Sequence, residues 1–153
     1  MKKLHVWIIS DEHYDHINMW IDQVRYDEKL CNHVKKHLLI EQILVESFTE
    51  VMDNTIQPDL ILMDMSTVIS KHGYARLQSG DFPNLVRFAR KHTSSILVLM
   101  SYVNSWAKEI HEELKEELKD EVVVEFCENG DKSIAEYLSE KVFEYYPMES
   151  TKK

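Results

Sequence analysis

The chain has little glycine and little proline, with three of each among 153 residues. Disordered segments and loop-rich β folds use these residues heavily, so their scarcity argues against both classes. The remaining composition is 44% hydrophobic, which in a chain of this length can build a core without metal or disulfide crosslinks. The composition therefore predicts a single globular domain rich in helix.

Cysteine is also scarce. Cys31 and Cys127 are the two thiols, and they show no CxxC spacing. The N-terminal apolar run is interrupted by His5 and lacks the small-residue cleavage site of a signal peptide. We therefore expect reduced cysteines in a cytoplasmic protein. No stretch approaches the roughly 18 consecutive apolar residues that a membrane helix needs, so we expect no membrane span.

Basic residues are outnumbered, and the net charge is −9. A nucleic-acid phosphate backbone needs a basic face, so direct nucleic-acid binding is not expected. A glycine-rich phosphate loop is missing as well, because no glycine precedes Gly73. This argues against a dinucleotide-binding enzyme of the Rossmann type.

The stretch from Pro58 to Ser66 contains the pattern around which the chain is organised. Four apolar residues run directly into Asp64, which is typical of a strand buried on both faces and ending in an acid. Similar apolar runs predict three more buried strands, and Leu38 to Val45 predicts an edge strand. The three runs are Leu4 to Ile9, Ile96 to Met100 and Val122 to Phe126.

Helical periodicity lies between these strands. Asp15 is a candidate N-cap for one long amphipathic helix that continues through Val34. Shorter helices are predicted after it, and Ser66 to Asp81 is predicted to be a loop. The further helices are Ser47 to Ile56, Leu85 to Ala89, Trp106 to Leu118 after a cap at Asn104-Ser105, and one ending at Tyr145 after a cap at Asp131. Alternating strands and helices predict an α/β fold, a parallel sheet with helices on both faces.

Polar residues end three of the predicted strands. Asp11 and Glu12 follow the first, Asp64 ends the third and Ser101 follows the fourth. Parallel strands bring their carboxyl ends to one edge, so these side chains are expected to converge. Converging carboxylates repel one another, and Mg²⁺ relieves that repulsion and often accompanies phosphate chemistry. Each acid taken alone is equally well explained by a strand that stops at the surface.

These residues resemble a known family. Ser10-Asp11-Glu12 is similar to the acidic motif of response-regulator receiver domains, and Pro58 to Asp64 is similar to their phosphoacceptor strand. Ile96 to Ser101 resembles the strand that carries the switch hydroxyl of that family. The resemblance extends from about Leu4 to Tyr145, and it implies a flavodoxin-like sheet of five parallel strands in the order 2-1-3-4-5.

The resemblance also implies roles for individual residues. Asp64 would accept a phosphoryl group, and Ser101 would sense it. Asp11, Glu12 and Asp64, with the carbonyl of Ser66, would bind Mg²⁺. Residues 1–146 would form the receiver-like domain and residues 147–153 a polar tail. Any catalysis would be limited to self-phosphorylation and dephosphorylation at Asp64.

Two departures from the family pattern indicate a degenerate site, as in a pseudo-receiver. Ser10 stands where the family usually has its first acid, and no lysine ends the fifth strand, where Glu125, Cys127 and Glu128 occur. Without that ammonium group, phosphoryl oxygens lose a charge-assisted hydrogen bond. The prediction is a stand-alone signalling domain that acts on a protein partner, a kinase or a signalling target. By the resemblance, it would do so through its fourth helix, the loop before that helix and its fifth strand.

A metal-dependent phosphoesterase is the alternative. Asp11, His13 and Asp64 are similar to the first ligands of calcineurin-like metallophosphoesterases, and Asn104 matches a later one. The Gly-Asn-His and Gly-His-x-His motifs of that family are absent. His13 and His16 are equally well explained as a solvent-facing pair.

Overall fold

The structure is a computed structural model, and it describes the seven segments that contain the regular elements. These are residues 2–10, 17–24, 27–43, 57–65, 82–101, 105–128 and 130–148.

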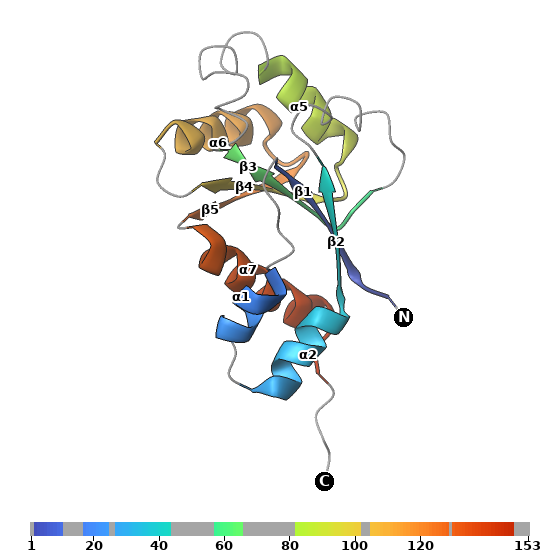
Figure 1. Ribbon diagram of the computed structural model, residues 1–153. Helices are drawn as coiled ribbons and strands as arrows, with labels where there is room; N and C mark the ends of the chain where they lie inside the picture. The colour runs from blue at the N-terminus through green and yellow to red at the C-terminus, as the bar shows by residue number, and fades with distance from the viewer. Residues whose placement is uncertain are drawn as a thin grey trace.

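A five-stranded parallel sheet forms the middle of the molecule (Figure 1). Its strand order is β2-β1-β3-β4-β5, the order of flavodoxin-like folds. The predicted sheet, including its order and its edge strand, is confirmed. The strands are β1 (Leu4–Ile9), β2 (Leu38–Ile43), β3 (Leu60–Asp64), β4 (Ile96–Ser101) and β5 (Val123–Glu128).

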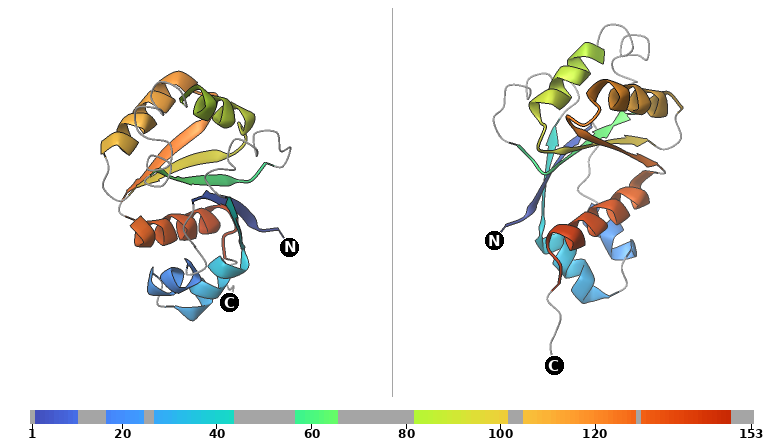
Figure 2. Two further views of the ribbon diagram at one scale, coloured as in Figure 1. Left: turned by 45° about the horizontal axis from the view of Figure 1, so that its top comes forward. Right: turned by 180° about the vertical axis from the view of Figure 1, so that it is seen from behind.

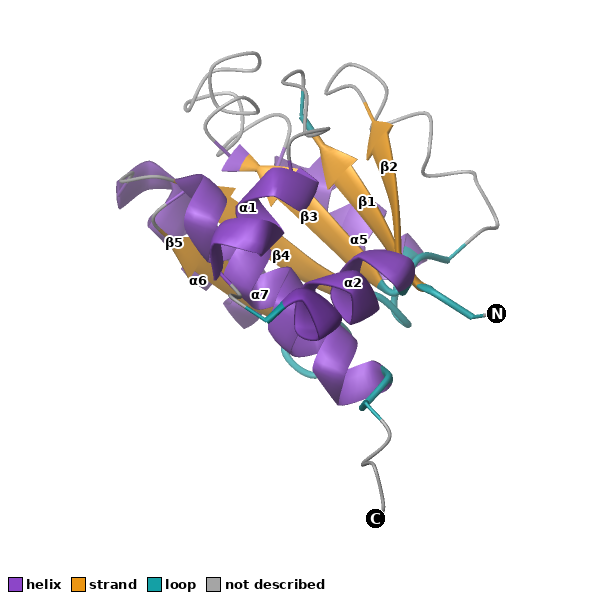
Figure 3. Ribbon diagram, turned by 60° about the horizontal axis from the view of Figure 1, so that its bottom comes forward, coloured by secondary structure: helices purple, strands orange, loops and turns teal. Residues whose placement is uncertain are grey.

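Helices cover both faces of this sheet (Figure 2). One face packs against α5 (Phe82–Lys91) and α6 (Ser105–Leu118). The other packs against α1 (Ile17–Val24), α2 (Glu28–Lys36) and α7 (Gly130–Tyr145), which Figure 3 shows in front of the strands.

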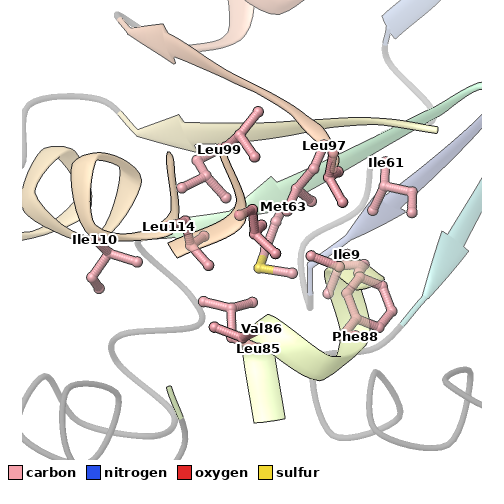
Figure 4. Packing of buried hydrophobic residues seen from close by; sticks show 14 of the residues in the cluster. Ile9, Ile61, Met63, Leu85, Val86, Phe88, Leu97, Leu99, Ile110 and Leu114 are labelled. Carbon is pink, nitrogen blue, oxygen red and sulfur yellow. The ribbon is translucent and has the colours of Figure 1, made fainter. Parts of the chain in front are cut away.

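Successive side chains of a strand point to opposite faces of the sheet, so a residue's position along its strand decides which helical layer it packs against. Ile61 and Met63 of β3 belong to the cluster with α5 and α6, and Figure 4 shows them packed around Phe88 and its neighbours. Leu60 and Leu62 belong to the cluster on the opposite face. All residues of β3 are buried, which is why this strand has a continuous apolar run instead of an alternating pattern.

The prediction of one long helix from Asp15 through Val34 is wrong. The chain forms two helices, because Asp27 has extended backbone angles (φ −81°, ψ 119°) and caps α2. Its carboxylate accepts a hydrogen bond from the Lys29 backbone N–H at 2.8 Å. The apolar periodicity continues across this break, since both helices pack against α7, and this continuity produced the error.

Several other boundaries shift by one or two residues. β4 includes Ser101 and β5 extends to Glu128. Leu44 and Val45, the predicted end of the edge strand, lie outside the described residues. The last helix begins at Gly130, ahead of the predicted cap at Asp131. The predicted helix from Ser47 to Ile56 and the predicted loop from Ser66 to Asp81 lie outside the described residues. Across the described segments, no helix has the length and apolar character needed to cross a membrane.

Candidate functional site

Asp64 is the last residue of β3 and is 5% exposed. It has the same parity along the strand as Leu60 and Leu62, so its side chain lies on the face covered by α1, α2 and α7. Charged side chains are seldom buried without a hydrogen-bonding partner. The question at this position is therefore which groups satisfy the carboxylate.

Ser10 supplies one such group. Ile8 and Ile9 of β1 pair with Leu62 and Met63, so the next residue, Ser10, lies level with Asp64. The Ser10 hydroxyl donates a hydrogen bond to Asp64 Oδ2 at 3.1 Å, and the serine is fully buried. Two residues that are 54 positions apart in sequence thus meet at the carboxyl edge of the sheet.

The backbone of Ser10 is held on its other side by β2. The Ser10 backbone N–H donates to the Ile43 carbonyl at 3.0 Å. The Gln42 side chain donates from Nε2 to the Ser10 carbonyl at 2.9 Å. These bonds continue the pairing of β1 with β2 beyond Ile9, so the hydroxyl is presented to Asp64 from an ordered strand end.

The residues of β4 and β5 that lie level with Asp64 carry no positive charge. Asp64 pairs with Met100 of β4, and Met100 pairs with Cys127 of β5. Cys127 is half-buried, and burial, with a smaller effect of the Glu136 charge, raises the pKa of its thiol to about 11. The Cys127 side chain is therefore a neutral thiol at physiological pH, not a base and not a positive charge.

Comparison with known proteins adds no relative: no family model, no curated protein and no solved structure matches the chain. The features that bear on function are therefore the sheet order and the residues at its carboxyl edge.

Of the predicted site residues, the structure describes the positions of Asp64 and Ser101 along their strands. Asp64 and Ser101 end neighbouring strands, and Ser101 lies one residue beyond the partner of Asp64. Asp11, Glu12 and Ser66 lie outside the described residues, as do His13, His16 and Asn104 of the alternative hypothesis. Both ligand sets therefore stay predictions.

Metal binding at this edge is likewise a prediction. Among the residues that the structure describes, no group of three or more His, Cys, Asp or Glu side chains is placed to hold a metal. Asp64 is the single described member of the predicted Mg²⁺ set.

Sequence reasoning missed one feature of the site. The family motif marks Ser10 as a departure and does not predict its hydrogen bond to Asp64. The signal was available, because the apolar runs of β1 and β3 end at these two residues. Converting that coincidence into a contact required the strand order and the register.

Proposed function

We propose that the protein is a receiver-like signalling module that acts through protein contacts, with a strand-end site that has lost most of its phosphotransfer chemistry. The observation that carries the proposal is the buried hydrogen bond from Ser10 to Asp64 at the carboxyl edge of a 2-1-3-4-5 sheet. Open α/β sheets place their functional residues at this edge.

The Ser10 hydroxyl changes what Asp64 can bind. A receiver-type metal site uses carboxylates from the first strand, and Mg²⁺ requires oxygen ligands in nearly ideal octahedral geometry. Serine contributes no negative charge, and its proton occupies one of the two Asp64 oxygens. Both effects lower the affinity of this edge for Mg²⁺ compared with a site that has an acid at position 10.

The residues of β4 and β5 that lie level with Asp64 support the same conclusion. A phosphoryl group on Asp64 would need a cation to stabilise its oxygens. The β5 residue that lies level with Asp64 is Cys127, whose raised thiol pKa keeps it neutral. A phosphorylated Asp64 would thus receive less stabilisation from β5 than the family's lysine provides.

A protein partner fits the surface formed by α6 and β5. The exposed side of α6 is predominantly acidic, and β5 beside it is an edge strand of the sheet. We propose that a kinase or signalling target with a basic surface binds here, in the cytoplasm, and that nucleic acid does not bind directly. The exposed α6 acids are Glu109, Glu112, Glu113, Glu116 and Glu117.

The site is tested by titrating ¹⁵N-labelled protein with Mg²⁺ and then with beryllofluoride, which mimics a phosphoryl group. We expect the Ser10 and Asp64 amide signals to stay unchanged up to millimolar Mg²⁺. Ser10→Asp restores the missing carboxylate, so this variant should bind Mg²⁺ more tightly than the wild type, and Asp64→Asn in the same background should abolish the gain.

The opposite result has a clear meaning. If wild-type protein binds Mg²⁺ and beryllofluoride at submillimolar concentrations, and Asp64→Asn removes both responses, then Asp64 is a working phosphoacceptor and the degenerate-site proposal is wrong.

A further inference from the structure

Two histidines lie next to each other at the carboxyl end of α2. His33 is in the last turn of the helix, and His37 is its C-cap residue. Their ring centroids are 4.3 Å apart, with an angle of 41° between the ring planes. This pair lies at the start of β2, whereas Asp64 lies at the end of β3, so the pair and the Ser10–Asp64 site are at opposite edges of the parallel sheet.

The end of α7 and the next residue, Tyr146, hold both rings in place. His33 stacks on Phe143 with ring centroids 5.5 Å apart and an interplanar angle of 7°. His37 stacks on Tyr146 at 5.1 Å and 23°. Because packing already orients the rings, binding of a ligand to both would cause little further loss of side-chain conformational entropy.

Each ring also uses one nitrogen on a backbone carbonyl. His33 Nε2 lies 2.6 Å from the Tyr146 oxygen, and His37 Nδ1 lies 2.8 Å from the His33 oxygen. A carbonyl oxygen accepts and cannot donate, so both of these nitrogens carry the hydrogen. In a neutral imidazole the other nitrogen then has a free lone pair. The two remaining nitrogens are His33 Nδ1 and His37 Nε2.

We propose that His33 Nδ1 and His37 Nε2 form a binding site for a divalent transition-metal ion, with Zn²⁺ as its representative. Metal-binding histidines commonly donate their second ring N–H to a carbonyl, which fixes the tautomer and the ring orientation. A zinc ion lies about 2 Å from each ligating nitrogen, so two nitrogens that bind one ion lie within about 4 Å of each other. Rings whose centroids are 4.3 Å apart can meet that limit.

The surroundings define the kind of ion. Imidazole ligands favour Zn²⁺, Ni²⁺ and Cu²⁺ over Mg²⁺ and Ca²⁺. The carboxyl end of a helix carries partial negative charge, which favours a cation, and the nearby Lys35 ammonium is paired with Asp22 at 2.8 Å. The described residues add no third His, Cys, Asp or Glu to the pair, so water completes the coordination of the ion.

The test uses Zn²⁺ alone as the probe, with the full chain. Calorimetry should show saturable binding of one ion per chain. In ¹⁵N-histidine spectra, the His33 and His37 ring signals should shift together as the ion binds, and Mg²⁺ at the same concentration should shift neither.

Two substitutions separate metal binding from helix packing. His33→Gln places an amide N–H where Nε2 donates, and His37→Asn does the same for Nδ1, so both variants can keep the carbonyl hydrogen bond while losing the metal ligand. Each should weaken Zn²⁺ binding by more than the roughly 10–100-fold that the loss of an outer-shell partner costs. His5→Gln is the matched control, because His5 contacts Glu41 near the same edge of the sheet, and it should bind Zn²⁺ as the wild type does.

Two results would overturn the proposal. The first is binding of wild-type strength in both His33→Gln and His37→Asn, which would place the ion at other residues. The second is measured in wild-type protein and does not depend on how well a variant folds: Zn²⁺ up to millimolar concentration that leaves the His33 and His37 ring signals unshifted. Because none of these readouts involves Asp64, the result is independent of the proposed signalling function.

Discussion

The hydrogen bond between Ser10 and Asp64 makes a quantitative prediction about stability. Ser10→Ala removes the hydroxyl that donates to a buried carboxylate oxygen. Hydrogen bonds to charged groups contribute about 1.5–3 kcal/mol to stability. Asp64 takes part in further interactions, so the carboxylate is not left without partners. We therefore expect a loss near the lower end, about 1.5–2 kcal/mol.

This loss is measurable in a chain of this size. For domains of about 150–250 residues, each kcal/mol changes the melting temperature by about 2–4 °C, so Ser10→Ala should lower Tm by about 3–8 °C. The assay is urea unfolding followed by circular dichroism at pH 7, with thermal melts in parallel. An unchanged m-value would show that the change lies in stability and not in compactness.

A double-mutant cycle assigns the loss to the pair. In an Asp64→Ala background the acceptor is gone, so Ser10→Ala should cost much less than it does in the wild type, with a coupling energy above about 0.5 kcal/mol. Ser95→Ala is the matched control, because Ser95 is also buried and donates from Oγ to the neutral Pro58 carbonyl at 2.5 Å. Its cost should be about 0.5–1.5 kcal/mol and should not change in the Asp64→Ala background.

If Ser10→Ala costs no more than Ser95→Ala, and its cost is the same with and without Asp64, the hydrogen bond contributes no charge-assisted stabilisation. Ser10 would then not hold Asp64 in place.

Three other perturbations test individual contacts. Burial, with a smaller contribution from Lys115, lowers the pKa of His111 below its ordinary value of 6.5. The unfolded chain therefore binds this proton more readily than the folded protein does, so stability should fall as pH drops below about 6.5. In His111→Gln, the urea midpoint should fall less between pH 7 and pH 5.5. Asp27→Ala removes the N-cap of α2 and should cost about 0.5–2 kcal/mol, whereas Asp27→Ser should retain most of the stability. With a thiol pKa of about 11, Cys127 should react with iodoacetamide at pH 8 far more slowly in the folded protein than in urea, and equal rates would contradict the burial argument.

The sequence alone determined the number and type of most described elements. Continuous apolar runs such as Leu4 to Ile9 require burial on both faces, and their alternation with helical periodicity leaves a parallel sheet as the economical arrangement. The sequence also placed Asp64 at a strand end, because the run before it stops at an acid. The break at Asp27 was readable as well, since an aspartate followed by glutamate is a common helix start, but the apolar spacing on both sides concealed it.

Tertiary structure alone decided which of these residues meet. Ser10 reaches Asp64 because two strands that are far apart in the chain become neighbours with one particular register, and a shift of a single residue would turn one of the side chains to the opposite face. His33 meets the Tyr146 carbonyl across 113 positions through the packing of α2 on α7. Contacts of this kind depend on how helices and strands pack against one another. Local patterns of hydrophobicity do not encode that packing.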